Sequence, residues 1–372
     1  MKSIIIFMVL ILGICTIISP AVWSKESSTG QSADDSFKKG NDLFTQGKLQ
    51  EAIQAYDEAI EKNPQHAGAL SNKAAALNQM GNFEEAILIC DEAIKIDPQY
   101  ANAWTNKGNS LNEMGRYEEA ISAYDEAIAI NPQLGETWFN KGLALGFLGR
   151  FEEAVQAYNK SIEADPLLAE AWYNKGLALG SLGKYDEAMM PYDEAIKINP
   201  QYAEAWSNKG MIFGSRGQYE EAIKALDEAI RIDPKLAEAW YNKGRALIGL
   251  GKNEEAVAAF DEAISIEPQF ALAWRYKGTA LVSQGKHEEA LQAFNEAIKI
   301  NPQFEAAWYH KGLALGEMGR FEEAVQAFNE TLSINPKLPE AWQKKAINLQ
   351  ALGRSLEAQD AYAKAKELGY TG

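Results

Sequence analysis

A period of 34 residues runs through this chain without an insertion from Ala33 to Gly372. It divides this stretch into ten repeats: 33–66, 67–100, 101–134, 135–168, 169–202, 203–236, 237–270, 271–304, 305–338 and 339–372. A repeat of this size is too small to bury an apolar face alone, so neighbouring repeats must stack on one another. The period therefore predicts one continuous solenoid instead of the two or three globular domains that a chain of 372 residues would otherwise suggest.

Each repeat is expected to hold two helices. Apolar or small residues at repeat positions 4, 8 and 11 have the spacing of one helical stripe and predict a first helix, helix A. Position 15 is Gly in every repeat, from Gly47 to Gly353, where a helix end favours a left-handed residue. Ala at position 20 and a mostly aromatic position 24 predict a second helix, helix B, which a Pro at position 32 ends in nine repeats.

This pattern resembles the tetratricopeptide repeat, whose signature is matched in the fifth repeat by Trp172, Gly176, Leu179, Ala188, Tyr192, Ala195 and Pro200. The resemblance implies an all-α fold, a right-handed α-solenoid of ten helix-turn-helix repeats. Position 7 departs from the family, because it is Lys in every repeat instead of an apolar residue. Glu occupies position 19 of every repeat and offers these lysines a partner. We expect instead that the lysine stems cover apolar flanks, since exposed ion pairs contribute only about 0–1 kcal/mol each.

A row of asparagines marks the other side of helix A. Positions 2, 6, 9 and 13 point away from the apolar stripe, and in the family that face lines a concave groove. Position 6 is Asn in six successive repeats: Asn72, Asn106, Asn140, Asn174, Asn208 and Asn242. Amides donate and accept hydrogen bonds, so such a row suits an extended peptide backbone. It is similar to the asparagine ladder in the repeat domain of O-linked N-acetylglucosamine transferases, without the catalytic region. The alternative is a polar groove that is merely common in the family.

Residues that interrupt this row are candidates for specificity. Position 6 changes to Tyr276, His310 and Lys344. Position 5 adds four flat side chains and a cation: Phe139, Tyr173, Tyr241, Tyr309 and Arg275. Aromatic and Arg side chains concentrate binding energy when they are desolvated. The sequence therefore predicts a main peptide groove over the third to seventh repeats and a distinct pocket near Tyr276 and His310.

The composition argues against catalysis and against nucleic acid. The three histidines, His66, His287 and His310, lack a second ligand at metal spacing, and no Gly-rich phosphate loop follows a strand. We therefore expect no catalytic residue, metal or cofactor. A net charge of −16 would repel phosphates. The prediction is a non-catalytic scaffold that binds a protein or extended peptide. One alternative is a substrate-presenting accessory subunit of a glycosyltransferase or other enzyme acting in trans, and another is a structural spacer that binds nothing.

Residues 1–24 predict export. Lys2 precedes an apolar run from Ile4 to Ile18, and small residues follow it, as in a signal peptide. Including Ser19 to Trp23 gives the length of a membrane anchor, so both alternatives stay open. The protein would be secreted after cleavage near residue 24, or anchored by this segment as its only membrane contact. Residues 25–32 are expected to form a polar linker.

Three further positions depart from the repeat. Gln359 and Lys366 stand where the other repeats have apolar residues, which is typical of a terminal cap. Pro191 inside helix B of the fifth repeat is expected to bend that helix locally. Asn159 and Asn329 begin glycosylation sequons, but the hydroxyl residues fall at core-facing positions, which favours a chance match.

Overall fold

The computed structural model describes residues 28–371, and this part of the chain is all-α. It divides into two compact modules, an N-terminal module up to Pro200 and a C-terminal module from Gln201 on, and each is described by itself. Helices with odd numbers are the A helices and helices with even numbers are the B helices. The prediction of helix-turn-helix repeats without strands is confirmed for the described residues.

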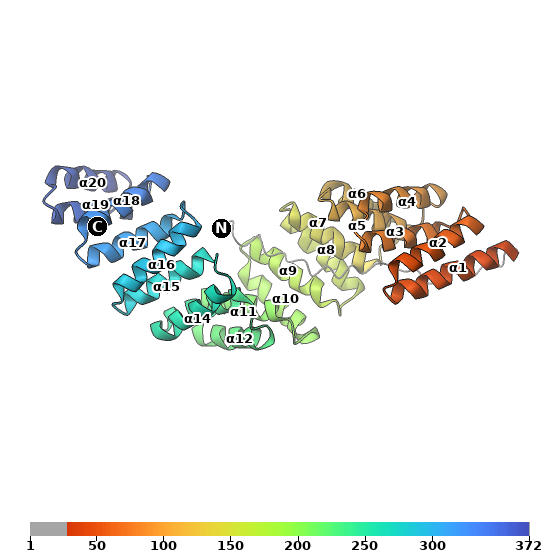
Figure 1. The fold of residues 1–372 in the computed structure, drawn as a ribbon, viewed down its shortest axis with the longest axis horizontal. Coiled ribbons are helices and arrows are strands. Elements are labelled where there is room, and N and C mark those ends of the chain that lie inside the picture. The colour runs from red at the N-terminus through yellow and green to blue at the C-terminus, as the bar shows by residue number, and fades with distance from the viewer. Residues whose placement is uncertain (1–27, 372) are drawn as a thin grey trace. The chain divides into compact units, whose positions relative to one another are not determined.

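Both modules are drawn in Figure 1. The N-terminal module contains α1 (Ser28–Thr45), α2 (Leu49–Lys62), α3 (Ala67–Gln79), α4 (Phe83–Ile96), α5 (Ala101–Glu113), α6 (Tyr117–Ile130), α7 (Gly135–Phe147), α8 (Phe151–Ala164), α9 (Ala169–Ser181) and α10 (Tyr185–Ile198). The C-terminal module contains α11 (Ala203–Ser215), α12 (Tyr219–Ile232), α13 (Ala237–Gly249), α14 (Asn253–Ile266), α15 (Ala271–Ser283), α16 (His287–Ile300), α17 (Glu305–Glu317), α18 (Phe321–Ile334), α19 (Pro339–Ala351) and α20 (Ser355–Glu367).

Glycine at position 15 makes the turn between the two helices of a repeat. These ten glycines, from Gly47 to Gly353, have φ between 73° and 81°, which other residues rarely adopt. At the end of α5, the Gly115 amide donates to the Asn112 carbonyl and the Arg116 amide donates to the Leu111 carbonyl. This paired arrangement satisfies carbonyls that the helix end leaves open. The predicted turn is therefore present in every repeat.

The core of each repeat depends on a close approach of its two helices. In the first nine repeats the residue at position 24 of helix B is buried, as Tyr158 is in α8, whereas Tyr362 in the last repeat is only partly buried. The Tyr158 ring lies against the backbone of Gly142 in α7, where an added Cβ would stand 2.5 Å from the ring. In the second repeat both partners change, because Ala74 replaces the Gly and the smaller Cys90 replaces the aromatic residue. Cys90 is buried in the same core, as the sequence predicts.

Helix A is more enclosed than its apolar stripe predicts. Within each module an A helix packs against the B helix of its own repeat and also against the B helix before it. Small residues at positions 3 and 10, such as Ala171 and Ala178, are therefore buried. Trp172 at position 4, which we assigned to the buried stripe, is only partly buried. It lies at the edge of the interface between consecutive repeats.

Trp and Lys side chains form the joint between consecutive repeats. The indole Nε1 donates to the carbonyl of the preceding repeat's position-32 proline at 3.0–3.1 Å, in Trp104, Trp138, Trp172, Trp240, Trp274, Trp308 and Trp342. The position-7 lysine lies over the same ring, as where the Lys141 Nζ is 5.4 Å from the Trp138 centroid. Each Trp is therefore held on two sides.

The lysines pair with a different acid from the one that the sequence suggested. Their partner is the Asp at position 25 of the preceding repeat, at N–O distances of 2.5–2.7 Å in Lys73–Asp57, Lys107–Asp91, Lys141–Asp125, Lys243–Asp227 and Lys277–Asp261. Six of the position-19 glutamates pair instead with a cation at position 16 of their own repeat, an arginine in four cases, as in Glu119 with Arg116 at 2.7 Å, and a lysine in Glu187 and Glu255. Each of the Lys–Asp ion pairs therefore links the lysine of one repeat to the Asp of the repeat before it.

The N-terminal boundary differs from the prediction. Helix α1 begins at Ser28, inside the segment 25–32 that we expected to be a linker. The predicted signal peptide or anchor, residues 1–24, lies outside the described residues. No helix between residues 28 and 371 combines the length and the apolar composition of a membrane span. Pro191 is buried inside α10, which continues through it from Tyr185 to Ile198.

Candidate functional site

The first two members of the asparagine row are buried. Asn72 in α3 and Asn106 in α5 are both 0% exposed. The Asn72 amide donates to the Asn41 side chain at 2.8 Å, and the Asn106 amide donates to the Ser71 carbonyl and hydroxyl at 3.1 and 3.0 Å. These two asparagines therefore join neighbouring A helices, and their assignment to a peptide-binding surface is wrong. The small Ser71 side chain lets α3 and α5 approach closely enough to cover both.

Asparagines at position 9 share this structural role. Asn41 accepts from both the Tyr56 hydroxyl, at 3.0 Å, and Asn72. Two repeats later, the Asn109 side chain accepts from the Tyr124 hydroxyl and from Asn140, both at 3.0 Å. Each such group satisfies a buried tyrosine and fixes the next A helix, because buried polar groups need partners. The sequence analysis missed it, although Asn recurs at position 9 in the first and third repeats.

Later members of the row are partly exposed. Asn140, Asn174, Asn208 and Asn242 all keep part of their surface open to solvent. The Asn174 amide donates to the Glu170 carbonyl of its own helix at 2.8 Å, so it holds no neighbouring helix. We call the side of the A helices that carries positions 2, 5, 6 and 9 the ladder face. On this face Asn140 is tied to Asn109 of the preceding A helix, whereas Asn174 and Asn242 have no hydrogen bond to a neighbouring helix among the described contacts.

Acidic residues lie on the ladder face at position 2. Burial raises the pKa of the Glu136 carboxyl in α7 to about 7. Burial also raises the pKa of Glu238 in α13, and the charges of Glu267 and Glu204 raise it further. These carboxyls are therefore protonated more readily than ordinary glutamates. The face changes its charge near neutral pH.

Around Tyr276 and His310, where the sequence predicts a distinct pocket, side chains of α13, α15 and α17 contact one another. Tyr241 and Tyr276 lie edge to face with ring centroids 5.6 Å apart. Arg275 Nη1 lies 3.5 Å from Nε2 of His310, and Tyr309 contacts the His310 ring with centroids 5.7 Å apart. These contacts and the stacking of Arg275 on Tyr276 link five of the predicted residues of the C-terminal module: Tyr241, Arg275, Tyr276, Tyr309 and His310.

Two residues of this group, Arg245 and Phe270, were not predicted from the sequence, and two candidate residues, Tyr173 and Lys344, lie outside it. Arg245 at position 9 of α13 lies 5.5 Å from the Tyr276 centroid, and sequence analysis overlooked it although it named position 9 as part of the face. Phe270 lies 4.9 Å from Tyr241 by ring centroids. Tyr173 belongs to the N-terminal module, where it contacts the buried ring of Tyr192 at 5.9 Å. Lys344 on α19 is partly exposed.

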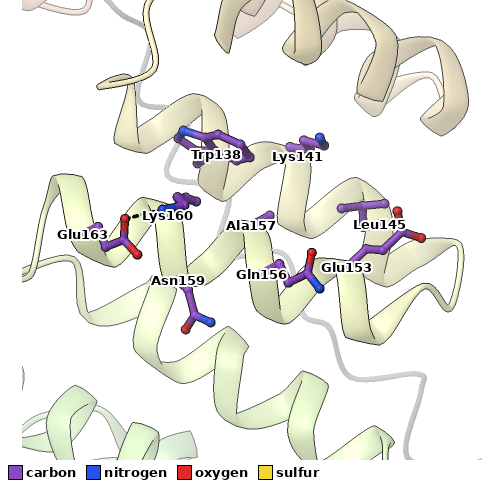
Figure 2. A pocket seen from close by; sticks show the side chains of 9 residues that line it. All are labelled: Trp138, Lys141, Leu145, Glu153, Gln156, Ala157, Asn159, Lys160 and Glu163. Carbon is purple, nitrogen blue, oxygen red and sulfur yellow. Dashed lines mark hydrogen bonds and ion pairs between the residues drawn. The ribbon is translucent and has the colours of Figure 1, made fainter. Parts of the chain in front are cut away.

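A shallow hollow of about 360 Å³ lies between α7 and α8. Figure 2 shows Trp138, Lys141 and Leu145 on its α7 side, and on α8 the ion pair between Lys160 and Glu163, at 2.6 Å. Its charged groups already have partners, because Lys141 pairs with Asp125. This arrangement leaves no free charge for a ligand. In the described part of the chain, no cluster of three His, Cys, Asp or Glu side chains has a geometry that could hold a metal ion.

Comparisons with known proteins agree on one repeat type. Family models described as tetratricopeptide repeat or TPR repeat match residues 37–101, 101–134, 123–156, 148–183, 169–202, 192–224, 210–251, 241–305 and 281–347. Together these matches cover the chain from residue 37 to residue 347.

Similar proteins share only part of the chain or only the fold. Hsp70-Hsp90 organizing protein 1 of Glycine max is 48% identical over 48 residues, which are 13% of this chain and 8% of that protein. The corresponding protein of Triticum aestivum is 46% identical over 48 residues, with the same shares. This chain therefore spans 8% of the length of either relative.

Among solved structures, the APC/C hetero-tetramer Cut9-Hcn1 matches 91% of this chain and 74% of its own, at 16% identity and a TM-score of 0.53. That likeness shows the fold alone. YrrB, described as a TPR protein with an unusual peptide-binding site, is 25% identical over 50% of this chain and 95% of its own, with a TM-score of 0.45.

Proposed function

This chain belongs to the tetratricopeptide repeat family, and on that premise we propose that it is a non-catalytic scaffold that binds an extended segment of a partner protein along the ladder face. The observation that carries the proposal is the change along the asparagine row. Asn72 and Asn106 are buried and hold helices together, whereas Asn174 and Asn242 are partly exposed and have no hydrogen bond to a neighbouring helix among the described contacts. An amide that does not hold a neighbouring helix can donate to and accept from the backbone of a bound peptide.

Aromatic side chains beside these amides support the same proposal. Phe139 in α7 and Tyr309 in α17 are partly exposed at position 5. Such rings contribute much of the binding energy in protein interfaces, because they bury a large area at a low entropic cost. The partly protonated Glu136 lies on the same face, so binding is expected to depend on pH between about 5 and 8.

The test is site-specific photo-crosslinking in the native cell, with the crosslinking amino acid at position 174 or, as a control, at exposed Gln54 on α2. We expect one partner to be captured from position 174 only, and mass spectrometry identifies it. The double variant Asn174→Ala with Asn242→Ala should then weaken binding of that partner by about tenfold, which is roughly 1.4 kcal/mol. Gln54→Ala with Gln292→Ala is the matched control.

Equal capture from both positions, or unchanged affinity of the double variant, would remove the ladder face from the mechanism. Failure to capture any protein would favour a structural spacer. Copurification of an active enzyme would favour the accessory-subunit alternative.

We further propose that the scaffold works in an exported or membrane-associated assembly. The support is the apolar run from Ile4 to Ile18 after Lys2. Cell fractionation combined with N-terminal sequencing of the mature chain tests this. A new terminus near residue 25 supports cleavage, and an intact terminus in the membrane fraction supports an anchor. An intact terminus in the cytosolic fraction contradicts both.

A further inference from the structure

Four side chains on the C-terminal module form a compact cationic cluster, which we call the arginine–tyrosine cluster: Tyr241 and Arg245 on α13, and Arg275 and Tyr276 on α15. The Arg275 guanidinium carbon lies 3.5 Å from the Tyr276 centroid. The Arg245 guanidinium carbon lies 5.5 and 5.6 Å from the Tyr276 and Tyr241 centroids. Stacking on ring faces does not use the N–H edges of the guanidinium groups. Both groups hydrogen-bond the Tyr276 side chain, and the remaining N–H groups of exposed Arg245 can bind other partners.

Neither arginine forms an ion pair among the described residues, unlike five other arginines of the chain. Arg116, Arg150, Arg320 and Arg354 each pair with a Glu three residues later, and Arg231 pairs with Glu228. Among residues 28–371, no carboxylate lies within 4.0 Å of the Arg245 or Arg275 guanidinium, although the chain carries 52 acidic residues. The Nε of Arg275 is buried without a hydrogen-bond partner. In this acidic chain, the positive charges of Arg245 and Arg275 therefore lie close together without a carboxylate partner among the described residues.

Neighbouring groups do not balance these charges. Burial and the charge of Arg275 lower the pKa of His310 to about 4, so this ring is neutral and its Nε2 faces the Arg275 guanidinium as an acceptor. Burial raises the pKa of Tyr276, but the charges of Arg275 and Arg245 lower it, and the net shift is downward. No carboxylate contributes to either shift. Glu238 on α13 is influenced by Glu267 and Glu204 and by neither arginine.

We propose that the arginine–tyrosine cluster binds a phosphate monoester carried by a side chain of the partner protein. A phosphate carries about −1.5 to −2 charges at neutral pH, which matches two guanidinium groups, whereas a carboxylate carries only one. Guanidinium groups bind phosphate oxygens through two parallel hydrogen bonds. The Tyr241 and Tyr276 hydroxyls add donors, and the open edge of Arg245, which is exposed, gives access from solvent. This inference deepens the proposed function and rests on it for the presence of a bound chain.

The cluster can be tested without knowing the partner. Isothermal titration calorimetry on the full chain uses inorganic phosphate, a short blocked alanine-glycine peptide with a central phosphoserine, the same peptide with Glu in its place, and the same peptide with Ser. We expect the phosphopeptide to bind at least tenfold more tightly than the Glu peptide, with no measurable binding of the Ser peptide. Inorganic phosphate that binds as tightly as the phosphopeptide would show a free-anion site and overturn the side-chain assignment.

Charge-removing variants assign the binding to the cluster. Arg245→Gln and Arg275→Gln should each lower phosphopeptide affinity by at least tenfold, and Arg231→Gln, an exposed arginine of α12, should leave it unchanged. Circular dichroism checks that the variants fold, and Arg245→Lys, which keeps the charge without the planar fork, should fall between wild type and Arg245→Gln. Equal binding by all variants contradicts the inference. Crosslinking from position 174 tests the scaffold function separately, so either proposal can fail alone.

Discussion

At the scale of single residues, position 25 controls the lysine of the next repeat. Asn159, Asn295 and Asn329 replace the usual Asp, and the lysines that follow them are Lys175, Lys311 and Lys345. Burial lowers the pKa of all three lysines, and none forms an ion pair among the described residues. The position-7 lysine over the Trp ring therefore has a carboxylate partner in some joints between repeats, and in others it has none among the described residues.

Restoring the acid should stabilise an unbalanced joint. We expect Asn159→Asp to raise the free energy of unfolding by about 0.5 kcal/mol, because a half-buried lysine gains a carboxylate partner. Thermal or urea unfolding measures this gain, which added salt should reduce. Lys175→Met should be nearly neutral in the natural chain and costly in the Asn159→Asp background. A loss of several kcal/mol in the natural chain would contradict the account.

Glu136 makes stability depend on pH. Its folded pKa of about 7 lies above the ordinary value of 4.5, so the folded protein binds a proton more tightly than the unfolded chain does. Its contribution to stability is therefore fully present below about pH 4.5 and is lost as the pH rises through 7. We expect Glu136→Gln to raise stability at pH 8 by about 2 kcal/mol and to flatten the dependence between pH 4.5 and 7.

Urea unfolding across this pH range provides the measurement, and exposed Glu152→Gln on α8 is the control. Parallel pH curves for Glu136→Gln and the natural chain would refute the assignment.

At the scale of the helix pair, the second repeat exchanges volume between its two helices. Ala74 with Cys90 replaces the usual combination of Gly with a large buried ring, such as Gly142 with Tyr158. The extra methyl group of Ala occupies space that a Tyr ring would fill. The two positions therefore act as one steric unit.

A double-mutant cycle tests this unit. We expect Cys90→Tyr to destabilise the protein by about 1–3 kcal/mol, because the ring would collide with the Ala74 side chain. Adding Ala74→Gly should recover most of that loss, even though Gly alone costs a helix about 0.5–1 kcal/mol. Chemical unfolding of the four variants gives the coupling energy. Additive effects would show that the two positions are independent.

The ends of the helices could be predicted from the sequence, but the arrangement of the candidate binding residues could be predicted only in part. The constant Gly at position 15 and the Pro at position 32 gave local signals that set each helix end. The burial of Asn72 and Asn106 was not predictable, because it depends on how closely α3 and α5 approach, which Ser71 permits. Tyr276, Arg275 and His310 could be expected to lie close together, because their repeat positions share one face of the A helices. The lack of a carboxylate near Arg275 could not be predicted, because it depends on how the surrounding side chains are placed.

For the whole molecule, stability is expected to be a sum over joints between neighbours, so the end of the array matters. Val325 on α18 is buried in a core cluster whose other buried members, Ala346, Leu349, Ala358 and Ala361, all belong to the last repeat. The equivalent position in the last repeat is Gln359, which is exposed. The polar substitutions predicted from the sequence therefore lie on the solvent side of α20.

Removing the last repeat should expose an apolar surface. A chain that ends at residue 338 is expected to self-associate, because Val325 and Leu332 lose their cover. Adding Val325→Gln and Leu332→Lys, which copy Gln359 and Lys366, should restore a monomer. Light scattering after size-exclusion chromatography measures the mass. A truncated chain that stays monomeric without these substitutions would contradict the prediction.

The joint made by Trp, Pro and Lys recurs at the same positions from repeat to repeat in both modules. Unequal recombination between copies of the coding segment would delete or duplicate one repeat and still bring together surfaces of the same chemistry. The number of repeats in such a protein can therefore change during evolution while the contacts between neighbouring repeats stay the same.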